Sequence, residues 1–488
     1  MTPKLRTGVG SPDRSTTLRV RTLAVVTAAV LAVAGLGVPA AAAPSGLPDD
    51  FNGDGYRDLA IGTPKASGGT VTVVFGSASG VSPARSVSIT QNTPGIPGTS
   101  ESEDKFGDNV TSGDVDGDGY ADLIIGAPGE RITDRPTGSV TIVRGGAKPF
   151  ATGAQMLTAP TAEAHAFGEG TSFTDLDGDG DANLVVVGSN SFWWYEDGNV
   201  TQDGALAPKV KFLPANVRLY GVVGGNFSST GSSDYVLHGQ RIDTNSTTSY
   251  VGLLRGGSGD LGSAYSVLAE GATAGSTAWE PAVSRGDING DGFDDLVTGN
   301  TAVGLGGSFT VRYGRAAGLP AAGTTYTQNS PGVPGANEEF DSFGAAVAVG
   351  DATGDGYADL AVGASYEDVN DRRNVGNVVL LKGSASGLST SGAQSFHQAT
   401  TGVPGAAEAG DHFGSSLRLR DINGNGRADL AVGAFGEDVL PNGYDDGAAW
   451  VLRGTASGLT ATDAASFNAT DFGYPVVEGR KFADVFAR

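Results

Sequence analysis

Apolar residues in this chain form short runs rather than stripes with a helical period. Typical runs are Leu59–Gly62, Leu123–Gly126, Leu360–Gly363 and Leu430–Gly433, and a second apolar run such as Val140–Val143 follows each of them. Glycine-rich turns of the type GSASG separate these runs from the next polar stretch. Short apolar runs bounded by turn residues are typical of buried β-strands. The pattern therefore predicts an all-β chain.

A nine-residue polar pattern, D-x-[DN]-x-[DN]-G-x-x-D, precedes the apolar runs. It occurs at 50–58, 114–122, 175–183, 287–295, 351–359 and 421–429, with a degenerate copy at 226–234. A Phe-Gly pair stands eight residues before several copies, as in Phe106-Gly107 and Phe343-Gly344. A repeat of this length holds about four short strands, which is the size of one propeller blade. Seven repeats predict a single seven-bladed β-propeller over residues 43–488.

The two ends of the chain indicate how such a ring closes. The first repeat begins almost directly with its polar loop, so that it lacks the strand that carries Phe-Gly. A Phe-Gly pair occurs instead near the end of the chain, at Phe472-Gly473, followed by Val476-Val477. We therefore expect the C-terminal strand to complete the first blade and to close the ring without a covalent link.

The N-terminal segment has the features of a secretory signal peptide. Basic residues such as Arg19 and Arg21 precede an apolar run from Leu23 to Val38, and small residues follow at Ala40–Ala43. A membrane anchor is the alternative, but it needs about 20 apolar residues. We predict that residues 1–42 are a signal peptide, that the protein is secreted, and that it has no membrane span.

Composition narrows the classes of function. The chain has 488 residues with 78 Gly, no Cys, and 54 Asp+Glu against 31 Lys+Arg, a formal net charge of −23. Without cysteine there is no disulfide scaffold, cysteine nucleophile or thiolate metal site. The acidic charge argues against nucleic acid or an anionic membrane as partner. We expect a monomer whose acidic residues bind cations or face an extracellular partner.

The polar loops have the oxygen ligands that calcium prefers. Side chains at positions 1, 3, 5 and 9, a carbonyl at position 7 and glycine at position 6 suit a hard cation. An EF-hand would need Glu at position 12, where this chain has residues such as Ile125 or Val362. We predict about five or six structural Ca²⁺ sites, weaker where Asn183, Thr353 or Asn425 replaces an acid; the alternative is that these loops are ordinary turns. The predicted ligands are Asp50, Asn52, Asp54, Tyr56, Asp58, Asp114, Asp116, Asp118, Tyr120, Asp122, Asp175, Asp177, Asp179, Asp181, Asn183, Asp287, Asn289, Asp291, Phe293, Asp295, Asp351, Thr353, Asp355, Tyr357, Asp359, Asp421, Asn423, Asn425, Arg427 and Asp429.

The combination of these motifs resembles a known family. Phe-Gly, then the acidic loop, then Gly126-Ala127-Pro128 is similar to the FG-GAP repeat of integrin alpha subunits and of exported bacterial proteins. The resemblance covers residues 49–488. It implies a seven-bladed propeller like the one that forms the head of integrin alpha subunits. It implies the fold more strongly than the biological role.

A second group of acidic residues marks a candidate partner face. Blades 2, 6 and 7 have longer loops at the end opposite the calcium-type loops, and in a closed ring these blades lie in one arc. The candidate residues are Glu130, Glu338, Glu339, Asp341, Glu367, Asp368, Glu408, Asp411, Glu437 and Asp438. Loops on a rigid scaffold often carry binding sites. The alternative is that this acidic arc only solubilises one face.

Binding is favoured over catalysis. The chain has no G-x-S-x-G or H-E-x-x-H motif, and nothing marks a nucleophile. We predict a secreted calcium-stabilised binding or adhesion module that recognises an extracellular protein or glycan; the alternatives are a lectin-like propeller and, third, a hydrolase or lyase. The run Phe192–Tyr195 could stack on sugars or pack between blades. Asn199, Asn226, Asn245 and Asn468 begin N-x-Ser/Thr sequons, a weak indication of a glycoprotein.

Overall fold

The computed structural model describes Met1 and residues 45–488, with gaps at 66, 133–134, 152, 162–164, 196–207, 245, 258–263, 273–281, 302–305, 440–444, 476 and 478. Residues Ala42–Arg488 form one compact unit. The predicted signal peptide lies outside the described residues.

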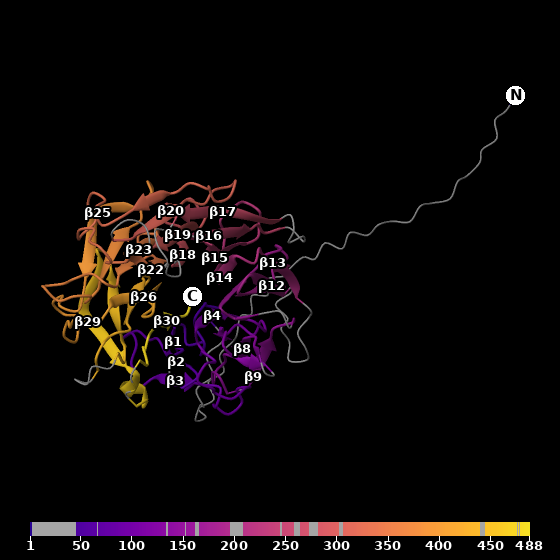
Figure 1. Ribbon diagram of the computed structural model, residues 1–488, viewed down its shortest axis with the longest axis horizontal. Coiled ribbons are helices and arrows are strands. Elements are labelled where there is room, and N and C mark those ends of the chain that lie inside the picture. Colours follow the sequence, from indigo (N-terminus) through magenta and orange to yellow (C-terminus); the bar gives the residue numbers. More distant parts are fainter. Residues whose placement is uncertain are drawn as a thin grey trace. The chain divides into compact units, whose positions relative to one another are not determined.

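The described strands form seven four-stranded antiparallel sheets arranged around a centre (Figure 1). The first three blades contain β1 (Leu59–Thr63), β2 (Thr70–Val74), β3 (Ser86–Ile89) and β30 (Val485–Phe486); β4 (Asn109–Gly113), β5 (Asp122–Ala127), β8 (Ser139–Val143) and β9 (Ala154–Thr158); and β10 (Gly170–Thr174), β11 (Asn183–Gly188), β12 (Ser191–Tyr195) and β13 (Lys209–Phe212). The fourth and fifth blades contain β14 (Val217–Gly225), β15 (Asp234–Asp243), β16 (Ser246–Leu254) and β17 (Tyr265–Ala272); and β18 (Val283–Gly286), β19 (Asp295–Asn300), β20 (Ser308–Arg312) and β21 (Thr324–Tyr326). The last two contain β22 (Phe343–Gly350), β23 (Asp359–Ala364), β24 (Asn377–Lys382) and β25 (Ser389–Phe396); and β26 (Phe413–Arg420), β27 (Asp429–Ala434), β28 (Ala448–Thr455) and β29 (Gly458–Asn468).

The blades pack face to face into a closed ring. Second strands such as β5 and β23 are buried along their whole length, because both faces of each sheet meet a neighbouring sheet. Each innermost strand contacts the innermost strand of the next blade, from β4 through β10, β14, β18, β22 and β26 to β30 and back to β4. The predicted all-β seven-bladed propeller is confirmed.

The Phe-Gly pair lies where two blades approach most closely. Phe106 is fully buried, and the Gly107 N–H donates to the Gly126 carbonyl of its own blade at 2.9 Å. The Gly107 carbonyl lies against Gly62 of the preceding blade, where a Cβ atom would clash. Gly107 itself has φ +91°, a conformation that favours glycine. The motif therefore joins blades within the ring.

The C-terminal strand closes the ring as predicted, but a different segment supplies it. β30 pairs with β1, so that Val485–Phe486 and not Val476-Val477 completes the first blade. Phe482-Ala483 takes the Phe-Gly position, because Gly447 faces Phe482 as Gly69 faces Phe106. The prediction of Phe472-Gly473 was wrong: Asn468 caps a 3-10 helix, Ala469–Phe472, which ends at Gly473 in the left-handed conformation. Val476 lies outside the described residues.

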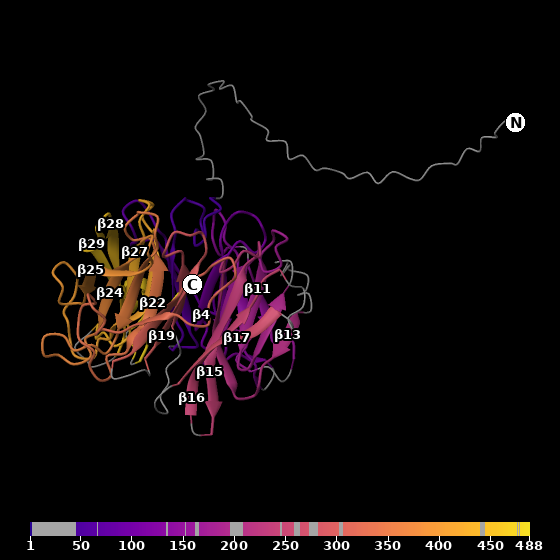
Figure 2. The ribbon, with the colours of Figure 1, turned by 90° about the horizontal axis from the view of Figure 1, so that it is seen from above.

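Two blades carry extra hairpins. β6 (Arg131–Ile132) and β7 (Arg135–Pro136) pair in the loop between β5 and β8 of the second blade. In the fourth blade, β15 and β16 extend beyond the neighbouring strands, and Figure 2 shows this hairpin projecting from the ring. The sequence analysis missed the second extension, because no acidic insertion marks it.

Candidate metal loops and the opposite face

Each predicted metal loop leads into the second strand of its blade and is organised by its first aspartate. Asp50 accepts the Gly53 N–H at 2.7 Å with one oxygen and the Gly55 N–H at 2.8 Å with the other. The first aspartates of the other five acidic loops accept the N–H of the glycine at position 6 in the same way. Gly55 adopts φ +88°, which explains why position 6 is glycine.

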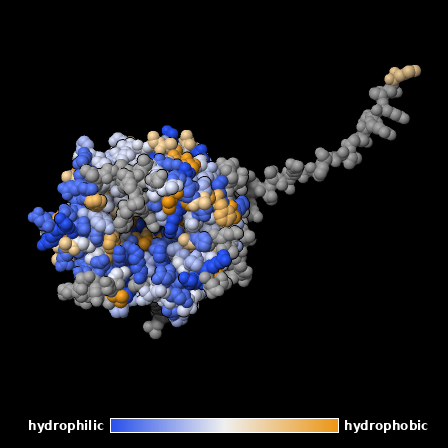
Figure 3. All heavy atoms as spheres, viewed as in Figure 1, coloured by the Kyte–Doolittle hydropathy of each residue, from blue (hydrophilic) through white to orange (hydrophobic). Residues whose placement is uncertain are grey.

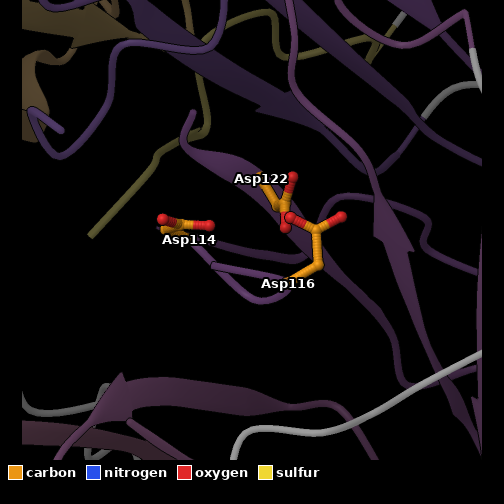
Figure 4. A group of neighbouring side chains, drawn as sticks. All are labelled: Asp114, Asp116 and Asp122. Carbon is orange, nitrogen blue, oxygen red and sulfur yellow. The ribbon is translucent and has the colours of Figure 1, made fainter. Parts of the chain in front are cut away.

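Two loops gather three carboxylates at metal-binding distance. In the second blade, oxygens of Asp114, Asp116 and Asp122 lie within 4.8 Å of one another, and Figure 4 shows the three side chains on one loop. In the third blade Asp175, Asp177 and Asp179 are equally close. The other acidic loops have amide or hydroxyl oxygens at some ligand positions (Asn52, Asn289, Thr353, Asn423 and Asn425). All of these donors are oxygens, and such a set fits Ca²⁺ or Mg²⁺ rather than a softer metal.

The ninth residue of each loop is buried and has an architectural role that the sequence analysis missed. Asp295 accepts the Ile288 N–H of its own loop and the Gly314 N–H, both at 2.9 Å. Asp58, Asp122, Asp359 and Asp429 likewise accept the N–H of a glycine at the end of the third strand of the blade or just after it. That glycine recurs in the GSASG-type turns, which is the signal that could have revealed this link.

Burial strongly affects the acidity of the ninth residues. Burial raises the pKa of Asp58 to about 8; its backbone hydrogen bonds lower the pKa, and nearby Asp50 and Asp54 raise it. Burial also raises the pKa of Asp295 to about 7, with smaller increases from Asp291 and Asp287. A carboxyl group in such surroundings is stabilised as an anion when a cation joins the loop.

Position 7 joins neighbouring loops through its side chain. A Cβ atom on Gly53 would meet the Tyr120 ring of the next loop, and Gly290 faces Tyr357 in the same way. Arg427 donates to the Thr353 carbonyl of the preceding loop at 3.1 Å. The sequence analysis assigned only the carbonyl of position 7 to a function. Its side chains link successive loops at this end of the ring.

An arginine enters the metal loop of the second blade. Arg144 lies 2.8 Å from Asp122 and 3.6 Å from Asp116. Both carboxylates are predicted ligands, so the guanidinium competes electrostatically with a cation at this loop. The sequence analysis did not predict this contact, because Arg144 follows the loop by more than twenty residues.

The degenerate loop at 226–234 keeps its architecture without the acidic ligands. Its last residue, Asp234, is fully buried and accepts the Gly256 N–H at 2.8 Å. At the earlier positions, the Asn226 side chain donates to the Gly292 carbonyl, and Ser228 and Thr230 bond to each other. This loop therefore retains the ninth-position link although it lacks a carboxylate cluster.

The predicted partner face is built from a structural cluster that occurs three times. Gln328 donates to Glu367 at 2.6 Å, Gln398 donates to Glu437 at 2.5 Å, and Gln91 donates to Glu130. Each cluster also contains a buried aspartate (Asp104, Asp341 or Asp411) that accepts the N–H of the residue three positions earlier. The sequence analysis missed the glutamines, although each stands at the same place before a Pro-Gly or Thr-Gly turn.

The ten residues of this face divide by exposure. Glu130, Asp341 and Asp411 are buried, whereas Glu338, Glu339, Asp368 and Glu408 are exposed and Glu367, Glu437 and Asp438 are intermediate. Burial raises the pKa of Glu437 to about 8, and the neighbouring Asp411 raises it further, while Gln398 lowers it. Burial likewise raises the pKa of Glu367 to about 7. The buried members hold two loops together, and the exposed members face solvent.

The remaining residues that the sequence singles out are buried or bonded within the fold, or lie outside the described residues. The run Phe192–Tyr195 forms β12 and is buried between blades, which removes it as a sugar-stacking platform. Arg285 of the Arg-Gly-Asp tripeptide pairs with Asp294 at 2.6 Å, and Asp287 accepts N–H groups of its own loop. Asn199 and Asn245 lie outside the described residues. In the part of the chain that the structure describes, no helix is long and apolar enough to span a membrane.

Comparison with known proteins identifies the repeat. The FG-GAP repeat family matches residues 42–74, 106–143, 281–314, 343–381 and 413–452. Integrin alpha-5 of Xenopus laevis is 30% identical over 230 residues, which cover 45% of this chain and 20% of that protein. Integrin alpha-V of Gallus gallus is 31% identical over 251 residues, covering 50% and 22%. The matched region thus spans about a fifth of the length of these integrins.

A solved structure of an Agrocybe aegerita lectin that recognises non-reducing terminal N-acetylglucosamine aligns with a TM-score of 0.38 and 16% identity, covering 71% of this chain and 82% of that chain. The sequence matches and the seven described blades agree with each other. The chain therefore contains FG-GAP repeats at the five matched segments, and its seven-bladed propeller resembles those of integrin alpha subunits.

Proposed function

We propose that this FG-GAP propeller is a secreted, calcium-stabilised binding or adhesion module without a catalytic centre. It engages an extracellular protein through the face opposite the metal loops. The observation that carries this proposal is the acidic edge of blades 6 and 7, where exposed carboxylates stand on loops that are fixed by half-buried Gln–Glu pairs.

Calcium fits the loops at the other end of the ring. Asp114, Asp116 and Asp122, and Asp175, Asp177 and Asp179, would hold the ion in the second and third blades. A bound Ca²⁺ would supply positive charge that offsets the repulsion within each carboxylate group and would stabilise the folded state by mass action. The side chains at position 7 would then connect one stabilised loop to the next.

The acidic edge suits a partner with basic groups. Glu338, Glu339, Asp368 and Glu408 are exposed, and the buried Asp341 and Asp411 accept the Glu338 and Glu408 N–H groups and hold those loops in place. Charged groups on preorganised loops raise association rates and select partners of opposite charge. We favour a protein over a glycan, because the candidate aromatic platform at Phe192–Tyr195 is buried.

Charge reversal at this edge tests the proposal. The labelled full chain would be titrated onto the surface of cells of the source organism in calcium, alongside Glu339→Lys/Glu408→Lys. A control, Asp243→Lys/Asp463→Lys, makes the same charge change at exposed sites outside the edge. We expect binding to weaken on the order of tenfold for the edge variant and to stay unchanged for the control.

Two results would contradict the proposal. If both variants bound as the wild type does, the acidic edge would not be the binding surface. If the wild type bound a glycan array in calcium and lost this binding in EGTA, the lectin-like alternative would replace protein recognition.

A further inference from the structure

The innermost strands enclose a cavity of about 1360 Å³ at the centre of the ring. Its lining includes Arg285, which precedes the metal loop of blade 5, and Arg418 and Arg420 of β26. The face of the ring seen in Figure 3 is largely hydrophilic. Three arginines that line one cavity are unexpected in a chain whose formal net charge is −23.

The carboxylates around these arginines do not balance their charge. Arg418 and Arg420 both contact the same oxygen of Asp49, at 3.3 and 3.0 Å. The other Asp49 oxygen accepts the Ser112 hydroxyl. Arg285 pairs with Asp294 at 2.6 Å. Three guanidinium groups therefore share two carboxylates, which leaves one positive charge in excess.

Most of the guanidinium N–H groups remain available. Each guanidinium has five N–H donors. Among the residues that the structure describes, Arg285 donates one hydrogen bond, to Asp294, and Arg418 donates one, to Asp49. Arg420 donates to Asp49 and to the Leu419 carbonyl. The Arg285 and Arg420 side chains are 38% and 33% exposed, so that their other donors are open to the solvent of the cavity, and the Arg418 side chain is 14% exposed.

We propose that Arg285, Arg418 and Arg420 form a binding site for a compact oxyanion, a carboxylate or sulfate group, inside the central cavity. Guanidinium groups bind such anions through paired, charge-assisted hydrogen bonds. Val347, Val349 and Leu417 line the same cavity. Apolar walls beside a charged group concentrate its field, and they suit an anion that is carried on a small organic molecule.

A purely structural role explains only part of this arrangement. Asp49 links Arg418 and Arg420 of blade 7 to Ser112 of blade 2, across the junction at which the ring closes. That link uses one donor of each arginine and does not involve Arg285. The excess charge and the remaining donors are what a bound anion would use.

Titration calorimetry with simple anions tests the site. The full chain in calcium would be titrated with sodium sulfate and, separately, with sodium acetate, against sodium chloride at equal ionic strength. We expect at least one oxyanion to bind at one site per chain. The sulfate arm tests a tetrahedral dianion and the acetate arm a planar carboxylate, so their relative affinities identify the chemistry of the anionic group.

Variants separate the site from general electrostatics. Arg285→Gln is expected to weaken binding by about tenfold or more, since it removes charge-assisted hydrogen bonds. It leaves the Asp49 link intact, and its melting temperature would verify the fold. Arg373→Gln removes the same charge from an exposed loop and should bind as the wild type does. The proposal is overturned if neither oxyanion binds beyond the chloride reference, or if Arg285→Gln and Arg373→Gln bind equally.

Discussion

At the metal-loop end of the ring, aspartates accept backbone N–H groups, whereas at the opposite end glutamates and aspartates surround a glutamine amide. Asp50 and Asp58 illustrate the first arrangement, with several N–H donors between them. Glu437 illustrates the second, with Gln398 as hydrogen-bond donor and Asp411 as a nearby acid. Both ends repeat their arrangement from blade to blade.

This difference separates two ways of keeping acids in a folded protein. The metal loops leave the fifth position exposed, so that a cation can approach it, and bury the ninth position. The opposite end buries acids beside one another, which raises their pKa values and favours their protonated form. Acids with raised pKa values occur at both ends, but only the metal-loop end should also respond to calcium.

Removal of calcium should lower the stability of the protein more than any of the substitutions below. Each site filled at a hundred times its dissociation constant adds about 2.7 kcal/mol to the free energy of unfolding. With several loops filled, EGTA should lower the melting temperature by about 10 °C or more. Differential scanning calorimetry would measure this, and excess Ca²⁺ should restore the original value. An unchanged melting temperature would contradict a structural role for calcium.

The aspartate at position 9 should contribute to the free energy of unfolding even in the degenerate loop, where no metal is expected. Asp234→Ala leaves the Gly256 N–H without its acceptor in a buried loop, at a cost of about 2 kcal/mol in the free energy of unfolding. The loss should be the same with and without calcium. Asp359→Ala removes three backbone hydrogen bonds and a predicted ligand, so its cost should grow when calcium is present.

Denaturant unfolding in calcium and in EGTA would measure both variants. Ser233→Ala, a change beside Asp234 that leaves the hydrogen bond to Gly256 intact, serves as the control. A calcium-dependent cost for Asp234→Ala would show that the degenerate loop binds metal after all.

The sequence predicted the blade fold and its repeat well, because the signals are local. The spacing from Asp114 to Asp122 and the buried run that follows lie within one loop and strand. Closure was also predictable, but its segment was not. Phe472-Gly473 matches the motif better than Phe482-Ala483 does, and only the pairing of β30 with β1 distinguishes them.

Contacts between distant segments were beyond the sequence analysis. Arg144 reaches Asp116, Gln398 reaches Glu437, and Arg418 reaches Asp49 from the far end of the chain. None of these pairs has a fixed local spacing that chemistry requires. The sequence therefore located the loops but not the side chains that surround them.

A change of pH should alter the stability that Glu437 contributes at the end of the ring opposite the metal loops. The folded-state pKa of Glu437 is about 8, above the ordinary value for glutamate, so the folded state binds the proton more tightly than the unfolded state does. This contribution to stability is complete at acidic pH and is lost as pH rises through about 8. Glu437→Gln imitates the protonated form and should melt about 2 °C above the wild type at pH 8.5 but not at pH 5.

Thermal melts in calcium across this pH range would follow the difference between the two proteins. Glu339→Gln, an exposed change on a neighbouring loop, should show no such trend. A constant difference between Glu437→Gln and the wild type at every pH would show that proton binding at Glu437 does not contribute.

The smallest effect on stability is expected where the C-terminal segment closes the ring, because Ala483 replaces the glycine of the repeat there. Ala483 adopts φ +61° at the position that Gly107, Gly168, Gly344 and Gly414 occupy in four other blades. Ala483→Gly relieves the left-handed strain but makes the unfolded chain more flexible, leaving a net gain of about 0.5 kcal/mol. The reverse change, Gly107→Ala, places a Cβ atom 2.9 Å from the Thr70 carbonyl and should destabilise the ring. Urea unfolding of both variants would test this: a loss of stability in Ala483→Gly would mean that Phe482-Ala483 does not act as the Phe-Gly pair of the first blade.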